Sequence, residues 1–306
     1  MATFYKPTST RSLLNKVINI VITHLNHTGV GVGKFQKKAI FVEHTLVGET
    51  VKVKITEQSS KFIKAKLVEV LTPSPDRIAP KCRHFQLCGG CDLQHIASDK
   101  HLSFKQQKVT ELFQRSGFTA KLPWQTALID KPFHYRRKVR IGVQYNKNDQ
   151  AIVGFRQKQS NHLISIHTCH VMAEPIADIF PALKQTIDKL SLKRSIGHIE
   201  VIHSDKIAVI IRQLVNINSV DKTLWQKVAK DNGWHIYLDN GKTITSVDEN
   251  VDNNETHQLS YRLLDDTEIR FGLDDFIQVN HAINQQMVTQ ALDWLELSAN
   301  DKVLDL

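Results

Sequence analysis

The sequence predicts a multidomain protein in which a small all-β domain precedes α/β regions. Three observations support this fold class: short β-branched runs over residues 16–71, a proline-rich break over residues 72–81, and mixed helix and strand patterns from residue 82 onward. At 306 residues, the chain has the length of about two ordinary domains. Hydrophobic residues make up 41% of it and charged residues 23%, as in ordinary globular proteins.

The N-terminal pattern predicts a small β-barrel of the oligonucleotide-binding type over residues 16–71. Apolar residues and lysines alternate along Val51–Ile55, so we expect one face of this strand to be buried and the other to be charged. Turn residues gather at 26–33. The predicted strands are Val17–Ile22, Ala39–Val42, Val51–Ile55 and Lys61–Val70.

The rest of the chain divides into a flexible start, a linker and two further regions. Residues 1–15 are mostly polar, and residues 72–81 hold three prolines, which break both helices and central strands. A central α+β domain is predicted for residues 82–270, with its first helix at 101–117. Residues 271–306 are predicted to begin an α/β domain.

The C-terminal segment predicts a helix followed by a strand. Asn280 can cap a helix in which apolar residues from Ile283 to Leu295 share one face. Val303–Leu306 then has the composition of a buried strand, and the sequence stops there. We therefore expect the α/β domain to be cut short at its beginning.

The distribution of charge favours a polyanionic partner for the first half of the chain. The net charge is +9, but residues 1–168 carry 27 basic and 10 acidic side chains, whereas residues 169–306 carry a net charge of −8. Such an asymmetry is typical of a nucleic-acid-binding surface. No apolar run approaches the roughly 18 to 20 residues that span a bilayer, and the polar N-terminus has no secretory signal. Membrane and secreted classes are therefore excluded, and a cytoplasmic location is expected.

The four cysteines predict a metal centre. Cys82, Cys88 and Cys91 follow a C-x5-C-x2-C spacing, and Cys169 is the fourth. Four thiolates suit either an iron–sulfur cluster or a tetrahedral zinc ion, and the absence of a second C-x2-C pair favours iron–sulfur. Four protein ligands indicate a structural role. Two alternatives remain: the thiols could be buried without a metal, or the site could hold zinc. Zinc remains an alternative because nearby histidines can act as ligands: His84, His95, His167 and His170.

Six motifs follow one another along the chain: Cys82–His95, Tyr135–Lys138, Gly154–Arg156, Ile166–Cys169, Phe276–Asn280 and Val303–Leu306. Together they resemble the RNA uracil-5-methyltransferases, in particular the branch that carries an RNA-binding TRAM barrel and methylates a uracil in 23S rRNA. Barrel, cysteine motif and later motifs follow the family's order and cover nearly the whole chain. The sequence reads Cys169-His170-Val171 where the family more often has Cys-Pro-Val, which leaves the ligand intact. Val303–Leu306 resembles the start of the family's motif for S-adenosylmethionine (SAM).

The resemblance implies a fold, two cofactors and a partner. After the TRAM barrel, it implies a central domain and the beginning of a Rossmann-like SAM-binding domain, against which the helix at 101–117 is expected to pack. Gln278 matches a SAM contact of the family, and the implied partner is 23S rRNA, bound by a monomer. The implied ligands of a 4Fe–4S cluster are Cys82, Cys88, Cys91 and Cys169.

The chemistry of uracil methylation implies that the reactive residues lie outside this sequence. C5 becomes nucleophilic only after a thiolate adds to C6, and a base must later remove the C5 proton. All four cysteines are assigned to the cluster, and no glycine-rich SAM loop follows Val303–Leu306. We therefore expect no catalytic residue in this chain, a catalytic cysteine and base beyond residue 306, and no methylation by the chain alone.

The basic residues predicted to contact RNA lie in the barrel and beyond the cysteine motif. Lysine and arginine bind phosphates, and arginine also stacks on bases. The predicted contacts are Lys34, Lys37, Lys38, Arg136, Arg137, Lys138 and Arg140. Two alternatives to an rRNA methyltransferase stay open: a non-catalytic RNA-binding module with a structural metal site, and a tRNA uracil-5-methyltransferase.

Overall fold

The computed structural model describes residues 12–26, 28–248 and 257–304. It divides into two compact units, which we call unit 1 and unit 2. Unit 1 comprises Met1–Gln86 and Cys91–Trp124, and unit 2 comprises Leu87–Gly90 and Gln125–Leu306. No helix within the described ranges is long and apolar enough to cross a membrane.

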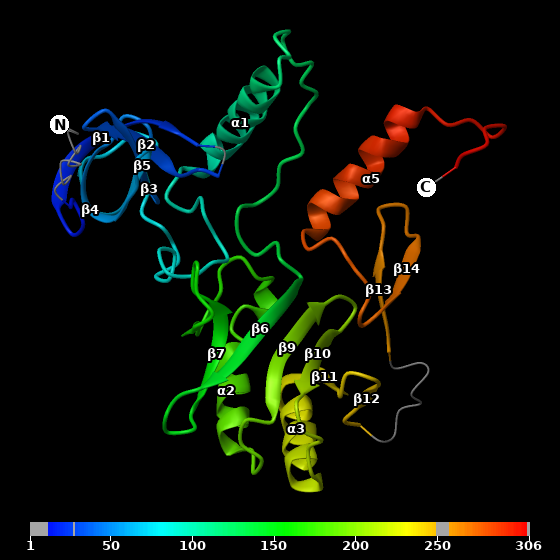
Figure 1. The fold of residues 1–306 in the computed structure, drawn as a ribbon. Coiled ribbons are helices and arrows are strands. Elements are labelled where there is room, and N and C mark those ends of the chain that lie inside the picture. The colour runs from blue at the N-terminus through cyan, green and yellow to red at the C-terminus, as the bar shows by residue number, and fades with distance from the viewer. Residues whose placement is uncertain (1–11, 27, 249–256, 305–306) are drawn as a thin grey trace, which may run out of the picture. The chain divides into compact units, whose positions relative to one another are not determined.

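Unit 1 is built around a closed barrel with the strand order β1-β2-β3-β5-β4 (Figure 1). On β4, Val51, Val53 and Ile55 are buried, while the positions between them lie at the surface. The predicted barrel is confirmed, because the period of two places one side of each strand inside. The strands are β1 (Val17–Leu25), β2 (Gly31–Phe35), β3 (Lys38–Val42), β4 (Thr50–Gln58) and β5 (Phe62–Thr72).

One strand of the barrel, β2, lies where the sequence analysis placed turn residues. A Cβ atom at Gly31 would lie 1.9 Å from the hydroxyl oxygen of Thr45, and one at Gly33 would lie 2.6 Å from the carbonyl oxygen of Val21. Glycine is therefore needed at both positions because neighbouring segments approach the strand closely. The prediction of a turn was wrong for these two residues.

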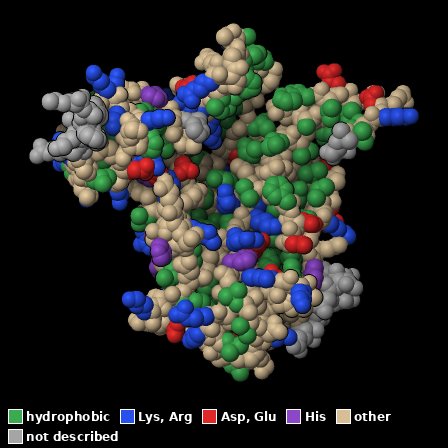
Figure 2. All heavy atoms as spheres, in the orientation of Figure 1, with side chains coloured by type: hydrophobic (Ala, Val, Ile, Leu, Met, Phe, Trp, Pro, Cys, Tyr) green, Lys and Arg blue, Asp and Glu red, His purple; other side chains and the backbone are tan. Residues whose placement is uncertain are grey.

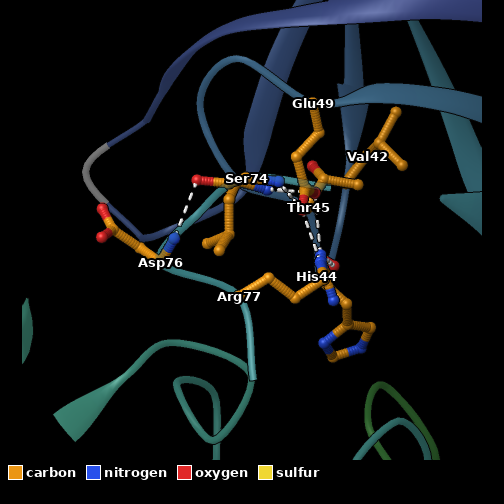
Figure 3. Close-up of polar contacts among 8 residues, drawn as sticks. Val42, His44, Thr45, Glu49, Ser74, Asp76 and Arg77 are labelled. Atoms are coloured by element: carbon orange, nitrogen blue, oxygen red, sulfur yellow. Dashed lines mark hydrogen bonds and ion pairs between the residues drawn. The ribbon is translucent and has the colours of Figure 1, made fainter. Parts of the chain in front are cut away.

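A buried ion pair attaches the proline-rich segment to the barrel (Figure 3). The fully buried carboxylate of Glu49 accepts hydrogen bonds from Arg77 Nε at 2.5 Å and from Arg77 Nη2 at 2.8 Å. It also accepts hydrogen bonds from the backbone N–H groups of Leu46 and Ser74. Burial raises the pKa of Glu49, but the hydrogen bonds from Arg77 and the backbone outweigh this effect and hold the pKa below its ordinary value.

The segment predicted as a linker is held to its neighbours in unit 1 by further hydrogen bonds. The guanidinium of Arg77 donates to the carbonyl oxygen of His44 at 2.8 Å. The N–H of Ile78 donates to the carbonyl oxygen of His95, and the N–H of Ala97 donates to that of Asp76. The segment is therefore an ordered part of unit 1.

A helix, α1 (His101–Arg115), packs on the barrel after a short 3-10 turn, η1 (Ser98–Lys100). Phe104 contacts the apolar core of the barrel, and the Lys108 ammonium donates to the carbonyl oxygen of Leu25 at 2.9 Å. Near the C-terminal end of the helix, Leu112 and Phe113 are about half exposed. The expected packing of this helix on a catalytic domain stays a prediction.

Unit 2 contains a seven-stranded sheet with the strand order β12-β11-β10-β9-β6-β7-β8. Two helices, α2 (Phe180–Lys189) and α3 (Ser219–Asn232), cover one face and share a large apolar core with it. A 3-10 turn, η2 (Glu174–Ile176), precedes α2. The strands are β6 (Lys138–Tyr145), β7 (Ala151–Arg156), β8 (Leu163–Ser165), β9 (Ile196–His203), β10 (Ile207–Gln213), β11 (Trp234–Asp239) and β12 (Ile244–Ser246).

A hairpin and a long helix follow the sheet. The hairpin of β13 (Gln258–Arg262) and β14 (Glu268–Gly272) packs Leu259 and Phe271 with buried residues of β9, β10 and β11. The helix is α5 (His281–Leu295), and the predicted cap is confirmed, because the Asn280 side chain accepts a hydrogen bond from the N–H of Ile283.

The predicted terminal strand does not form within the described residues. Val303 and Leu304 are exposed and belong to no strand, and Asp305 and Leu306 lie outside the described part of the chain. A strand requires a neighbour with which to pair its backbone, and apolar composition alone does not supply one.

Replacing Glu49 with glutamine is expected to lower the free energy of unfolding by about 3 kcal/mol, because the largely buried Arg77 charge loses its partner. Since folding lowers the pKa of Glu49, its contribution to stability is present above the unfolded-state pKa and is lost as the pH falls through the folded-state pKa. Urea unfolding of both proteins from roughly pH 3 to pH 7 measures the two effects.

The matched control is Glu57→Gln, also in the barrel. Glu57 pairs with Lys64 at 2.8 Å, but both side chains are about half exposed, so the expected loss is below about 1 kcal/mol. Equal losses for the two variants would contradict the special role of the buried pair.

Candidate functional site

Within unit 2, Cys88 lies against the end of strand β7. Cys88 forms an antiparallel bridge with Gln157, and the N–H of Gly89 donates to the carbonyl oxygen of Arg156 at 3.0 Å. A Cβ atom at Gly89 would lie only 3.3 Å from that oxygen. The glycine next to Cys88 therefore allows the cysteine loop to approach the strand closely.

Cys169 follows strand β8 in a tight turn of unit 2. Its N–H donates to the carbonyl oxygen of Ala177 at 3.0 Å, and its own carbonyl oxygen accepts from the N–H of Met172 at 3.1 Å. The carbonyl oxygen of Val171 accepts from the N–H of Arg136 at 2.8 Å. The backbone hydrogen bonds thus fix the turn that carries the fourth cysteine.

Within unit 1, Cys82 and the buried ring of His95 are held by neighbouring side chains of the cysteine motif. The N–H of Cys82 donates to the Gln94 side chain at 3.1 Å. The His95 ring is buried against Phe85, and neither ring nitrogen has a hydrogen-bond partner among the described residues. Burial, and then the charge of Arg77, lowers the pKa of His95 to about 4, so this ring is neutral near pH 7.

The predicted metal ligands are divided between the two units. In the described ranges, no three His, Cys, Asp or Glu side chains have an arrangement that could hold a metal ion. Cys82 and Cys91 belong to unit 1, and Cys88 and Cys169 belong to unit 2. All four lie within the described ranges and none forms a disulfide. Metal ligation by the four thiols stays a prediction.

The backbone of the Tyr-Arg-Arg motif forms hydrogen bonds with several segments of unit 2. Arg136 forms backbone bridges with Met172 and Asn280. The N–H of Arg137 donates to the carbonyl oxygen of Val279 at 2.9 Å, and its carbonyl oxygen accepts from the N–H of His203 at 2.8 Å. These two residues therefore join the Cys169 turn, the end of β9 and the start of α5.

The side chain of Arg137 is placed inside unit 2, with only 4% of the residue exposed. Its guanidinium lies over the ring of Tyr261, 4.3 Å from the centroid. Nε donates to the carbonyl oxygen of Gln278 at 2.9 Å, and Nη1 lies 3.0 Å from Nδ1 of His281. Burial lowers the pKa of Arg137, although contact with Tyr261 opposes this effect.

The Phe-x-Gln-x-Asn segment presents two side chains to solvent. Phe276 is 82% exposed and the Gln278 side chain is exposed, whereas Ile277 between them is buried. The ammonium of Lys138 donates to the carbonyl oxygen of Asp275 at 2.6 Å. Arg137 and Lys138 thus hold the backbone of this segment, and Gln278 is left able to contact a ligand.

The predicted basic contacts differ in their surroundings. Lys34 and Lys37 are exposed, at the end of β2 and in the turn that follows it, whereas the Lys38 ammonium donates to the carbonyl oxygen of Ser59 at 2.8 Å. Arg140 is exposed and forms an ion pair with Glu200. Figure 2 shows Lys and Arg side chains on the visible face of the barrel, where they are accessible to a polyanion.

Comparison with known proteins identifies the family to which this chain belongs. The TRAM domain family model matches residues 11–68. The 23S rRNA (uracil(1939)-C(5))-methyltransferase RlmD of Colwellia psychrerythraea is 43% identical over 330 aligned residues, covering all of this chain and 70% of the relative. The chain belongs to this RlmD family. The enzyme of the same name from Shewanella sediminis is 37% identical, covering all of this chain and 69% of the relative.

A solved structure resembles the fold of this RlmD-family chain. It is that of the Pyrococcus abyssi tRNA (uracil-54, C5)-methyltransferase in complex with S-adenosyl-L-homocysteine, with a TM-score of 0.62. The match covers 90% of this chain and 64% of that one, at 21% sequence identity. At this identity the comparison supports the fold alone.

Sequence reasoning missed the residues that surround Arg137 in this RlmD-family chain. Tyr261, His203 and His281 come from a hairpin strand, the end of β9 and the first turn of α5. Together with Arg137 and Asp130 they line a pocket of about 610 Å³. The Tyr-Arg-Arg and Phe-x-Gln-x-Asn motifs each contribute to this pocket, but no single motif signals it, because its walls come from stretches that are far apart in the sequence.

Proposed function

We propose that this chain forms the RNA-binding and cluster-bearing part of an enzyme that methylates C5 of a uridine in 23S rRNA. The observation that carries the proposal is the 43% identity, over the whole chain, to a relative named for that reaction. The TRAM match and the exposed basic side chains of the barrel support an RNA substrate. We further propose that the protein acts as a monomer in the cytoplasm.

Gln278 is the residue of this chain proposed to contact SAM. SAM supplies the methyl group when it is bound. The exposed amide of Gln278 fits a polar contact, and Arg137 fixes the backbone of the same residue from the other side. The role of this chain is then to hold the amide in place beside the exposed ring of Phe276.

The nucleophile is proposed to lie outside residues 1–306. A thiolate must add to uracil C6 before C5 can react, and all four cysteines of this chain are assigned to the cluster. The proposed reaction therefore needs a further cysteine, and a base for the C5 proton, from a segment that this sequence does not contain.

The chain alone is expected to transfer no methyl group from labelled SAM to unmodified 23S rRNA, because it lacks a free nucleophile. A chimera in which the final 30% of the Colwellia psychrerythraea relative follows residue 306 is expected to label a uracil at C5. Nuclease digestion and chromatography of the labelled nucleosides measure the product.

The intact relative serves as the positive control, and bulk tRNA serves as the second substrate. Label in 23S rRNA from the chain alone would contradict the assignment of the cysteines. Label in tRNA and none in rRNA would favour the alternative that the protein is a tRNA methyltransferase, the class of enzyme named for the similar solved structure.

A 4Fe–4S cluster bound by four thiolates is proposed as the structural metal centre. The donor set fits, since four cysteines are present and none is used in a disulfide. The close approach of Gly89 to Arg156, and the hydrogen bond from Cys169 to Ala177, support a structural use, because they fix the backbone beside two of the proposed ligands. The remaining ligands are Cys82 and Cys91.

Anaerobically purified protein is expected to be brown and to hold about four irons per chain. Cys88→Ser should lose the iron and lower the thermal stability, because binding of a structural metal is coupled to folding. The matched control is His170→Ala, which removes a possible zinc ligand next to Cys169 and should retain the iron. A colourless protein with one zinc, lost in His170→Ala, would contradict the proposal.

Basic side chains are proposed to bind RNA phosphates: the exposed Lys34 and Lys37 on the barrel, and in unit 2 the exposed Arg140 with the partly buried Arg136 and Lys138. Lys38 is also among the proposed contacts, although its ammonium donates to the Ser59 carbonyl oxygen. Phosphate contacts displace counterions from the RNA, so their number is measurable from the dependence of affinity on salt.

The double variant Lys34→Ala, Lys37→Ala is expected to weaken RNA binding and to reduce the slope of log affinity against log salt by about one to two. Fluorescence anisotropy with a labelled rRNA fragment measures both quantities. The control is Lys52→Ala, Lys64→Ala, since these lysines already pair with Glu69 and Glu57. An unchanged slope in the first variant would remove the barrel lysines from the interface.

A further inference from the structure

The pocket beside Arg137 has the size of a site for one nucleoside. Its volume is about 610 Å³, within the range of roughly 300 to 1,000 Å³ that is usual for small-molecule sites. All of its walls belong to unit 2, and they include the N-terminal turn of α5, the hairpin strand β13 and the end of β9.

One buried hydrogen-bond donor in the pocket wall lacks a partner. Arg137 is 96% buried, and its Nε and Nη1 atoms are used, but Nη2 has no hydrogen-bond partner within the described residues. A buried guanidinium nitrogen without an acceptor is costly, so the pocket favours a ligand that supplies one.

The pocket also contains a buried acceptor without a partner. The Oδ2 atom of Asp130 is buried and accepts no hydrogen bond from the described part of the chain. A phosphate would satisfy Arg137 but would be repelled by the carboxylate of Asp130. The formal charges around the pocket balance, since it is lined by Lys131, Arg137, Arg262, Asp130, Glu174 and Asp205.

Aromatic side chains form another part of the wall, among them Tyr261, His203 and His281. The ring of Tyr261 lies between the Arg137 guanidinium, Phe271 and His281. Burial, together with the neighbouring charge of Arg137, lowers the pKa of both His203 and His281. Neutral imidazoles can donate or accept hydrogen bonds and offer flat surfaces for stacking.

A ligand for this pocket must therefore be flat, nearly neutral and able to donate and accept hydrogen bonds. Nucleobases have these properties, and single-stranded RNA presents them for stacking on aromatic and arginine side chains. We propose that this pocket binds the base of one unstacked RNA nucleotide, additional to the uridine that is methylated. This inference rests on the proposed RNA substrate, and it makes Arg137 a base contact instead of a phosphate contact.

The test fills the pocket with a side chain. Ala282 lines the pocket on α5, and Ala282→Phe should block it. The matched control is Ala291→Phe, an exposed position on the same helix, which lies on the opposite side because nine residues correspond to about two and a half turns. Circular dichroism and thermal unfolding establish that both variants are folded.

Binding is measured by fluorescence anisotropy with a labelled single-stranded RNA of about ten nucleotides and with the same strand in a duplex. Ala282→Phe is expected to weaken single-strand binding about ten-fold, with an unchanged salt slope, because one base stack is lost and no phosphate contact is. Duplex binding should not change, and Ala291→Phe should change neither. Equal weakening for both RNAs, or no weakening for either, would overturn the assignment.

A second measurement does not depend on the folding of a variant. Single-stranded RNA containing 4-thiouridine is irradiated with the unaltered protein, and cross-linked peptides are identified by mass spectrometry. Cross-links at Tyr261 or His281 support the assignment, and cross-links confined to the barrel overturn it. If the protein bound neither RNA, the proposed function itself would fail, which is distinguishable from RNA binding that is insensitive to Ala282→Phe.

Discussion

The buried guanidinium of Arg137 is the interaction on which the arrangement of unit 2 depends. Taking this charge out of water is costly, and the structure offsets that cost with the Tyr261 ring and the Gln278 carbonyl oxygen. The same residue uses its backbone to bind Val279 and His203. One residue therefore fixes the start of β6, the end of β9 and the segment that leads into α5.

The position of Arg137 also determines which neighbouring side chains face solvent. Successive residues of an extended segment point to opposite sides, so Lys138 lies on the other side from Arg137 and holds the Asp275 carbonyl oxygen. With the backbone held from both sides, Phe276 and Gln278 are exposed. A basic motif that looks uniform in sequence thus contains one residue that builds the scaffold and others that remain accessible.

Much of the fold could be predicted because local patterns determine it. Alternating Val51, Val53 and Ile55 identified the barrel wall, and Asn280 identified the start of α5. Gly31 and Gly33 were wrongly predicted to lie in a turn. Glycine is common in turns, but it also occurs in a strand that another segment approaches closely, and the sequence alone does not distinguish the two cases. The pocket around Arg137 could not be predicted, since Tyr261 and His281 reach it only through tertiary packing. A motif joins residues that are near one another in sequence, whereas the walls of this pocket come from several separate stretches of the chain.

The path of the chain between the two units affects how this protein can be divided. Residues 87–90 belong to unit 2 although unit 1 residues precede and follow them. A fragment that begins at Gln125 would lack Leu87 and Gly89, whose backbones form hydrogen bonds with Lys158 and Arg156 at the end of β7. The N–H of Lys158 and the carbonyl oxygen of Arg156 would then have to form hydrogen bonds with water. A single cut therefore cannot yield two complete pieces, and domain dissection would require a rejoined chain in which residues 87–90 are restored to the sheet.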